Sequence, residues 1–207
     1  MILAVLASDT QKKEIAASAF FQKHEVVFSE NISLWLHHTA DAYIDFGFAP
    51  SAEKIEKLTK LLPRPILINA VTETLNDIHP DFIRFNGWPG FLKGKYLEAA
   101  ANNESQSVAG ALFRDQILFV KDEPGFVSAR IVSMIINEAY FTLEAGTSTK
   151  EEIDIAMKLG TGYPFGPFEW GEKIGLWRVS ELLLKLSIGN PAYELAQTLI
   201  NVPNSGM

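Results

Sequence analysis

Residues 1–28 read MILAVLASDTQKKEIAASAFFQKHEVVF, and this stretch decides the fold of the first half of the chain. Its opening run, residues 1–7, is apolar and predicts a short buried strand. Residues 10–23 then place apolar side chains at helical spacing, and β-branched and aromatic residues predict a second strand over residues 25–28. A strand, a helix and a strand in this order are typical of a mostly parallel sheet.

The same alternation continues beyond this stretch. Residues 42–48 and 65–69 predict two further strands, and the intervening residues 51–62 predict a helix that Pro63 ends. From about residue 122 the pattern becomes helical, and no strand pattern follows residue 121. We therefore predict an α/β fold followed by an all-α part, namely a reduced, Rossmann-like and mostly parallel sheet over residues 1–121 and a helical domain over residues 122–207.

Within the helical half, the spacing of apolar residues predicts the individual helices. A helix with apolar residues from Val127 to Leu143 ends near Gly146, and Ser148 with Glu151 predicts a capping box that opens the next helix. The further helices are predicted over residues 149–159, 176–186 and 192–200.

Composition limits the function classes. The chain has 207 residues, a formal net charge of −7 and no cysteine. The acidic balance argues against nucleic acid or an anionic membrane surface as the main partner, and the lack of cysteine excludes disulfides and thiolate chemistry. The apolar start meets Asp9 at once and is too short for a leader or a membrane span, so we expect a cytoplasmic protein.

Several motifs of the helical half carry a family resemblance. They are Pro124-Gly125-Phe126, Asn137-Glu138-Ala139, Ile153-Asp154 and the run GTGYPFGPFE at residues 160–169. These motifs resemble the C-terminal domain of the 3-hydroxyacyl-CoA dehydrogenases. The resemblance implies a homodimer formed through the helical domain, an acyl-CoA ligand and, in an active enzyme, NAD as the cofactor. The glycines and prolines of residues 160–167 also predict a tight connection between two helices.

The first half resembles the dinucleotide-binding domain of the same family in reduced form. Residues 23–30 and 79–98 carry this resemblance, whereas about thirty to forty residues of the usual two-half layout have no counterpart between Glu30 and Asp41. Glu30 follows the second predicted strand, where the family has an acid that binds ribose hydroxyls. Glu30 is therefore a candidate cofactor-binding residue, and the alternative is a solvated loop residue.

The turn after the first strand is unfavourable for a dinucleotide. The resemblance places Ala7, Asp9 and Lys12 at the three glycine positions of the family's turn. A carboxylate about 4 Å from a phosphate charge costs roughly 4 kcal/mol at an effective dielectric constant of about 20, and the helix dipole returns only about 0.3–2 kcal/mol. We therefore expect no NAD, and we expect Asp9 or Thr10 to cap the first helix.

The catalytic positions of the family are also altered. The resemblance places Glu98 on the glutamate that orients the catalytic histidine, Asn86 on that histidine and Ala129 on an asparagine. It places Glu73, or its neighbour Thr72 or Thr74, on a serine. An amide such as Asn86 has no proton equilibrium near neutral pH and cannot be a general base. Glu73 and His79 remain as alternative bases, Glu73 if burial raises its pKa.

Two adjacent histidines raise the question of a metal. His37 and His38 have no further ligand at a fitting spacing, so no metal site is predicted.

Three functions remain open from the sequence. The leading hypothesis is a dimeric, non-catalytic relative of the 3-hydroxyacyl-CoA dehydrogenases that binds an acyl-CoA. The alternatives are an active or weak NAD-dependent dehydrogenase with a rearranged site, and a structural or assembly subunit.

Overall fold

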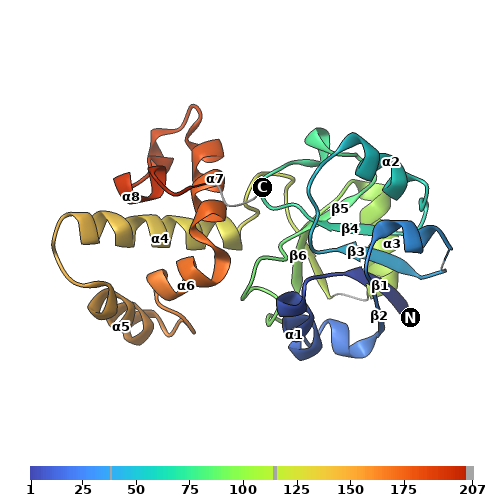
Figure 1. Cartoon of the computed structure of the whole chain (residues 1–207), viewed down its shortest axis with the longest axis horizontal. Helices are drawn as coiled ribbons and strands as arrows, with labels where there is room; N and C mark the ends of the chain where they lie inside the picture. The colour runs from blue at the N-terminus through green and yellow to red at the C-terminus, as the bar shows by residue number, and fades with distance from the viewer. Residues whose placement is uncertain (38, 114–115, 204–207) are drawn as a thin grey trace. The chain divides into compact units, whose positions relative to one another are not determined.

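The computed structural model describes residues 1–37, 39–113 and 116–203, which form the two compact units Met1–Phe126 and Val127–Met207 (Figure 1). All strands of the described residues belong to the first unit, and the second unit is helical. The predicted fold class, a mostly parallel Rossmann-like sheet followed by a helical region, is therefore confirmed.

The first unit is built around one seven-stranded sheet with the order β2-β1-β3-β4-β5-β6-β7. Neighbouring strands run parallel except β5 and β6, which are antiparallel. The strands are β1 Ile2–Leu6, β2 Glu25–Ser29, β3 Ala42–Asp45, β4 Ile66–Asn69, β5 Ile83–Phe85, β6 Leu97–Ala100 and β7 Ile117–Phe119.

The strand order explains where the chain is shortened. In the two-half Rossmann layout a third strand lies outside the second one. Here β2 leads into the 3-10 helix η2, Ile32–His37, and the next strand, β3, lies on the other side of β1. The described residues between Glu30 and β3 therefore include no strand that would cover β2, which forms an edge of the sheet.

Short helical segments connect the strands of the first unit. They are α1 Asp9–Ala17, η1 Phe21–Lys23, α2 Ala52–Thr59, η3 Leu75–Asp77 and α3 Asn103–Phe113. The prediction of one helix over residues 10–23 was wrong at its end, because the chain becomes extended at Ser18. This break allows the consecutive rings of Phe20 and Phe21 to enter the core together.

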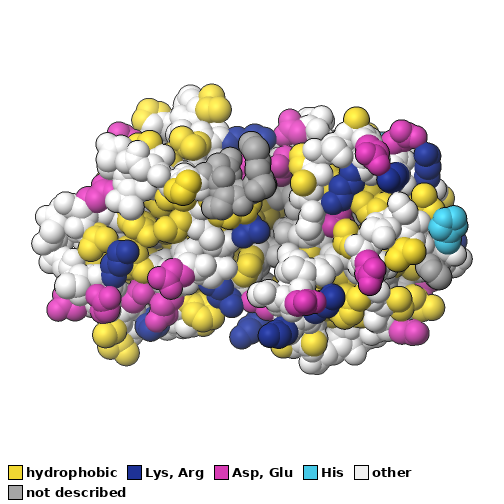
Figure 2. All heavy atoms as spheres, in the orientation of Figure 1, with side chains coloured by type: hydrophobic (Ala, Val, Ile, Leu, Met, Phe, Trp, Pro, Cys, Tyr) yellow, Lys and Arg dark blue, Asp and Glu magenta, His cyan; other side chains and the backbone are white. Residues whose placement is uncertain are grey.

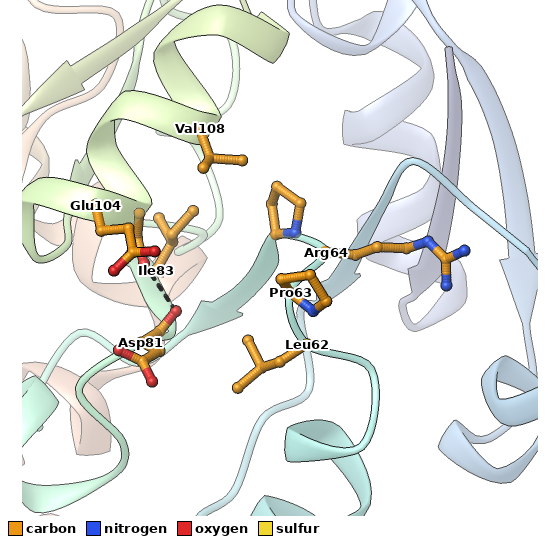
Figure 3. Close-up of a pocket in the computed structure, with 9 residues that line it drawn as sticks. Leu62, Pro63, Arg64, Asp81, Ile83, Glu104 and Val108 are labelled. Carbon is orange, nitrogen blue, oxygen red and sulfur yellow. Dashed lines mark hydrogen bonds between the residues drawn. The ribbon is translucent and has the colours of Figure 1, made fainter.

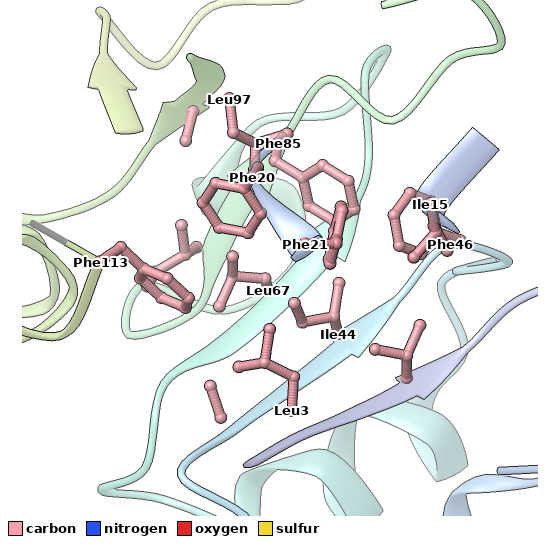
Figure 4. Packing of buried hydrophobic residues seen from close by; sticks show 14 of the residues in the cluster. Leu3, Ile15, Phe20, Phe21, Ile44, Phe46, Leu67, Phe85, Leu97 and Phe113 are labelled. Carbon is pink, nitrogen blue, oxygen red and sulfur yellow. The ribbon is translucent and has the colours of Figure 1, made fainter. Parts of the chain in front are cut away.

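Aromatic and aliphatic side chains fill one face of the sheet (Figure 4). Phe46 and Phe85, which lie at or beyond the ends of β3 and β5, meet edge to face with their ring centroids 5.0 Å apart. Phe20 stacks on Phe113 of α3 at 5.2 Å. Such ring pairs add about 0.5–1.5 kcal/mol beyond their area burial, so they help to hold the short α1 and the C-terminal end of α3 against the sheet.

A buried cation ties the loops after β4 to the end of the first unit. The side chain of Arg84 on β5 is fully buried and forms an ion pair with Asp122. Its Nε donates to the carbonyl of Ala70 at 2.9 Å and an Nη donates to that of Val71 at 3.3 Å. Burial lowers the pKa of Arg84, whereas the nearby carboxylates raise it, Asp122 most of all.

Replacing Arg84 tests how much this ion pair contributes to the free energy of unfolding. We expect Arg84→Met to lower the free energy of unfolding by about 3–5 kcal/mol, because it leaves the Asp122 carboxylate without its cationic partner and removes one donor from each of the carbonyls of Ala70 and Val71. Lys57→Met is the control, since it removes an exposed i,i+4 pair with Glu53 and should cost less than about 1 kcal/mol. Equal losses in urea denaturation would contradict a structural role for the Arg84 ion pair.

His24 precedes β2 and is half-buried against the rings of Phe20 and Phe113. Burial lowers the pKa of its imidazole, and the positive charges of the N-terminus and Lys23 act in the same direction. Gln116 opposes this shift through a hydrogen bond. The folded protein therefore holds His24 in its neutral form more strongly than the unfolded chain does.

This shift predicts a loss of stability in mild acid. A histidine with a lowered folded-state pKa contributes its full stability above the unfolded value of about 6.5, and the contribution is lost as the pH falls below that value. We expect the urea midpoint of the natural chain to fall more between pH 7.5 and pH 5, values that bracket about 6.5, than the midpoint of His24→Gln. A parallel decline of both proteins would show that His24 does not control this response.

The second unit consists of helices and short turns. They are α4 Ser128–Glu144, α5 Lys150–Thr161, α6 Pro167–Ile174, α7 Leu176–Ser187, η4 Pro191–Tyr193 and α8 Gln197–Ile200. No helix among the described residues is both long enough and apolar enough to span a bilayer.

The run at residues 160–167 forms the predicted tight connection. Gly162 ends α5 in the left-handed conformation, with φ +70°, and α6 begins at Pro167. The buried carboxylate of Asp154 accepts hydrogen bonds from the backbone N–H groups of Phe168 and Glu169. A side chain at Gly166 would overlap Asp154, because an added Cβ would lie 2.4 Å from its Cγ.

Two details of the helical prediction were wrong. The capping box of α5 pairs Thr149 with Glu152 instead of Ser148 with Glu151, although Ser148 also donates to the Glu152 carboxylate at 2.7 Å. The predicted helix over residues 192–200 is divided, because Asn137 of α4 bonds to the backbone of Glu194 and Ala196 and holds that segment extended.

Candidate functional site

The candidate site lies at the carboxyl ends of β1 and β3. From β1 the chain passes through α1 to β2 on one side, whereas β3 adjoins the other side of β1. In open α/β sheets ligands bind at such a switch point, outside the carboxyl ends of the strands. The residues at this point are those after β1, after β3 and after β4.

The turn after β1 ends in a capped helix. Ser8 is the N-cap of α1, and it forms a capping box in which the Ser8 N–H donates to Gln11 Oε1 at 2.9 Å. The prediction that Asp9 or Thr10 caps this helix was therefore wrong. Three residues with capping side chains stand in a row, and β1 ends early enough for the first of them to take the role.

Asp9 occupies the first turn of α1 and points into solvent. Its side chain is 95% exposed and pairs with Lys12 at 2.9 Å. Solvent screening lowers the repulsion between this carboxylate and a bound phosphate from the predicted 4 kcal/mol towards about 1 kcal/mol, the value for two charges 4 Å apart in water. The side chains and the cap of this turn are therefore a stronger obstacle to a pyrophosphate than the charge of Asp9.

The carboxyl ends of the strands are bonded to one another. The carbonyl of Phe46, after β3, accepts from Gln11 Nε2 at 3.2 Å and from Asn69 Nδ2 at 3.0 Å. Asn69 also accepts from the backbone N–H of Gly87 at 2.9 Å, and an added Cβ at Gly87 would lie 2.8 Å from Asn69 Cγ. Side chains of this chain thus occupy the space directly above β3 and β4.

A buried acid that the sequence analysis did not identify lies beside this network. Asp45, the last residue of β3, is fully buried and pairs with Lys54 of α2 at 2.7 Å. Burial raises the pKa of Asp45, whereas Lys54 and the N–H of Gly47 lower it. The pair fixes the start of the β3–α2 connection, and no local spacing rule links a strand residue to a helix residue nine positions later.

The structure brings Asn86 and Glu98 together. The pairing of β5 with β6, extended by one residue, sets them opposite each other, and the Asn86 N–H donates to the Glu98 carbonyl at 2.9 Å. Directly opposed residues of antiparallel strands have their side chains on the same face. Asn86 is buried, and its side-chain oxygen accepts from the N–H of Trp88 at 3.2 Å.

The other candidate bases lie in the loop after β4 and before β5. His79 accepts from the N–H of Asp81 at 3.2 Å through Nδ1 and stacks on Phe82 with ring centroids 4.6 Å apart. Glu73 is half-buried and close enough to Arg84 to influence its pKa. The ring of His79 is thus engaged in a turn, whereas the charge of Glu73 acts on the buried cation.

The remaining predicted positions are separate. Glu30 is exposed just beyond β2, and His37 is exposed at the end of η2, while His38 lies outside the described residues. Ala129 is fully buried within α4 of the second unit. Across the described ranges, no three His, Asp or Glu side chains converge as a metal would require.

A separate hollow lies at the opposite ends of the strands, where β4 and β5 begin (Figure 3). It has a volume of about 170 Å³, and Leu62, Pro63, Ile83 and Val108 form its apolar lining. Ser105 donates to the carbonyl of Asp81 at its rim. Ligand pockets typically measure about 300–1,000 Å³, so this hollow is too small for a nucleotide-containing ligand, and it includes none of the predicted site residues.

Comparison with known proteins identifies the helical region. Residues 125–206 match the family model described as 3-hydroxyacyl-CoA dehydrogenase, C-terminal domain. This region belongs to the 3-hydroxyacyl-CoA dehydrogenase family. The match confirms the resemblance that was based on the motifs between residues 124 and 169.

Individual relatives support the same assignment. The chain is 39% identical over 95 residues to the 3-hydroxyadipyl-CoA dehydrogenase of Escherichia coli, a match that covers 44% of this chain and 20% of that enzyme. It is 50% identical over 56 residues to the human mitochondrial hydroxyacyl-coenzyme A dehydrogenase, covering 27% of this chain and 18% of the relative. The matched part is thus about a fifth of each of these 3-hydroxyacyl-CoA dehydrogenases.

A solved structure of the family extends the likeness to the fold of the whole chain. The (S)-3-hydroxybutyryl-CoA dehydrogenase of Ralstonia eutropha aligns over 96% of this chain and 91% of its own, with a TM-score of 0.71 and 20% identity. At this identity the likeness establishes the fold alone. The sheet of the first unit is therefore Rossmann-like in the manner of the 3-hydroxyacyl-CoA dehydrogenases.

The cap of α1 can be tested directly. We expect Ser8→Ala to lower the free energy of unfolding by about 1 kcal/mol, because the N–H of Gln11 loses its acceptor. Thr10→Ala serves as the control and should change it by less than about 0.5 kcal/mol, since Thr10 lies exposed within the first turn. A larger loss for Thr10→Ala in chemical denaturation would restore the original capping prediction.

Proposed function

We propose that this chain is a non-oxidising relative of the 3-hydroxyacyl-CoA dehydrogenases that binds an acyl-CoA and acts as a homodimer. The observation that carries the proposal is the turn between β1 and α1, where a capped helix with side chains at every position stands in place of a glycine turn.

A dinucleotide site needs a turn of glycines, without side chains between the backbone and the pyrophosphate. The glycines of the Rossmann motif let the backbone approach the pyrophosphate, and the helix N-terminus binds the phosphates with its free N–H groups. Here Ser8 and Gln11 satisfy each other's N–H groups, and Gln11 also reaches across to the carbonyl of Phe46. A pyrophosphate would have to displace these contacts and pass the side chain of Asp9.

The catalytic positions give independent support. The arrangement of Asn86 opposite Glu98 agrees with the alignment that places them on the family's histidine and glutamate. An amide at the first position cannot accept a proton from the hydroxyl of a substrate. In this proposal Glu98 occupies the position of the family's orienting glutamate, but the residue opposite it, Asn86, is not a base.

The proposed ligand follows from the region that remains most similar to the family. Residues 125–206 match the C-terminal domain, and the relatives that match this chain are named for reactions on CoA thioesters. A thioester can bind without NAD, since binding and hydride transfer use different groups. We therefore assign the ligand to the acyl-CoA class and leave its acyl chain undefined.

The proposed dimer rests on the surface of the helical unit. Hydrophobic side chains gather on that unit in Figure 2. Val127, the N-cap of α4, and Ile131 within α4 are 51% and 50% exposed, and Ile155 and Leu159 of α5 are 54% and 82% exposed. Both pairs have i,i+4 spacing, so each forms a stripe along one side of its helix. Exposed apolar surface of this kind marks interaction sites.

Ligand binding separates the three hypotheses. We expect no heat of binding from NADH up to about 1 mM in calorimetric titration, and stabilisation of the folded chain by acetoacetyl-CoA. A ligand at 100 times its Kd adds about 2.7 kcal/mol to the free energy of unfolding, which a thermal shift readily detects. Free CoA is the control that isolates the contribution of the acyl group.

Other outcomes would favour the alternatives. Micromolar NADH binding with turnover of a 3-hydroxyacyl-CoA would contradict the proposal and support a rearranged dehydrogenase. In that case Glu73→Gln and His79→Gln would identify the base, because only loss of the true base abolishes the rate while NADH still binds. Dimer formation without binding of either ligand would favour an assembly subunit.

A further inference from the structure

Strand β2 forms one edge of the sheet, and its outer side is open. The N–H of Glu25 donates to the carbonyl of Met1 at 2.9 Å, and the register pairs Val26 with Leu3. Successive residues of a strand direct their backbone groups to opposite sides. The N–H and C=O groups of Val26 and Phe28 therefore point away from β1, and they have no backbone partner among the described residues.

The strand itself carries none of the usual protective residues, although the ammonium of Lys12 lies 5.6 Å from the centre of the Phe28 ring. Exposed edge strands commonly carry a proline, a central lysine or a bulge, each of which prevents pairing with another strand. β2 reads EVVFS over five residues, with its one charge at Glu25. Val27 and Phe28 are 46% and 41% exposed. A regular, apolar and unpaired edge of this kind can accept another strand.

We propose that β2 pairs antiparallel with β2 of a second copy of this chain, around a two-fold axis at Val27. The two seven-stranded sheets then form one continuous sheet. This interface is independent of the apolar stripes of the helical unit and of any bound ligand.

The backbone geometry permits this register. Val26 and Phe28 supply the outward backbone groups, and a symmetric pairing centred at Val27 uses both residues of each copy. It sets each Val26 opposite a Phe28 and places the two Val27 side chains face to face. The two β-branched side chains then meet on one face, in the pair type that brings side chains closest. Such a two-fold contact is closed, since each copy uses the same surface.

The charges at the ends of β2 agree with this register. The pairing brings Lys23 of one copy within one residue of Glu30 of the partner subunit, so opposite charges lie near each other at both ends of the paired strands. Glu25 lies opposite Ser29 of the partner subunit. No like charges face each other in this register.

Charge-swap variants at Val27 test the interface. They are made in a Leu159→Lys background, which places a charge on the most exposed residue of the helical stripes and so removes the dimer proposed above. In this background we expect the chain to remain dimeric in sedimentation velocity at about 100 µM. We expect Val27→Lys and Val27→Glu each to weaken the dimer by at least about tenfold, since like charges then face each other at the axis.

An equimolar mixture of Val27→Lys and Val27→Glu should restore dimers, because opposite charges then meet. Leu118→Lys on β7, at the other edge of the sheet and 53% exposed, is the matched control and should have no effect. Hydrogen exchange gives a direct readout, in which the amides of Val26 and Phe28 become protected as the concentration rises. Val27→Lys should abolish this protection.

Two results would overturn the proposal. One is a chain that stays monomeric in the Leu159→Lys background, with Val26 and Phe28 amides that exchange at the same rate at every concentration. The other is an oligomer that Leu118→Lys disrupts and Val27→Lys does not, which would place the contact at β7. Neither result bears on acyl-CoA binding, so the proposed function is tested separately.

Discussion

The first unit depends on one buried cation, because Arg84 is the point at which three segments meet: β5, the loop after β4 and residues 122–126. Its guanidinium binds the carbonyls of Ala70 and Val71 after β4, pairs with Asp122 and lies 4.6 Å from the centre of the Phe126 ring.

Phe126 adopts a positive φ of 49°, which is unfavourable for a residue with a large side chain. The stacked cation and the bond from the Gly125 N–H to the Val71 carbonyl hold it there. A fully buried charge persists only when it is paired and hydrogen-bonded in this way, so the ends of β4 and β5 cannot move independently of residues 122–126.

That rigidity bears on the site, since the same strand ends carry Asn86 and Asn69. Asn86 directly follows β5 and Asn69 ends β4, and each accepts a backbone hydrogen bond close to Arg84. The carboxyl edge of the sheet is therefore a network of satisfied polar groups. A dinucleotide site requires unsatisfied donors aimed at the ligand. The fold has kept the strand order that creates a switch point, while local side chains fill the place at which a ligand would bind.

Sequence reasoning found the parts of the structure whose causes are local. The apolar runs at residues 1–7 and 65–69 predicted strands because both faces of these strands are buried, and Gly162 with Pro167 predicted a tight connection through backbone conformation alone.

Other elements could not be found in this way. β5 and β7 have only three residues each, too few to show a period. Helix α6 was not assigned because its N-cap is Gly166, which has no capping side chain, and because the N–H groups of its first turn bind Asp154 of the preceding helix. The Asp45–Lys54 pair and the capping of α1 by Ser8 instead of Asp9 likewise depend on where neighbouring elements end. For the candidate site, the structure places Asn86 opposite Glu98, whereas the catalytic role of Glu98 and the roles of Glu73, His79 and Glu30 stay predictions.

The absence of a strand outside β2 among the described residues has a physical consequence at that edge. Without a neighbour outside β2, the apolar side chains of Val27 and Phe28 are left half-exposed, and two backbone positions point into solvent. The turn capped by Ser8 and the strand ends bonded through Asn69 are fixed by their own contacts. The exposed apolar surfaces are the edge at β2 and the stripes of α4 and α5, and association is the role that we propose for both.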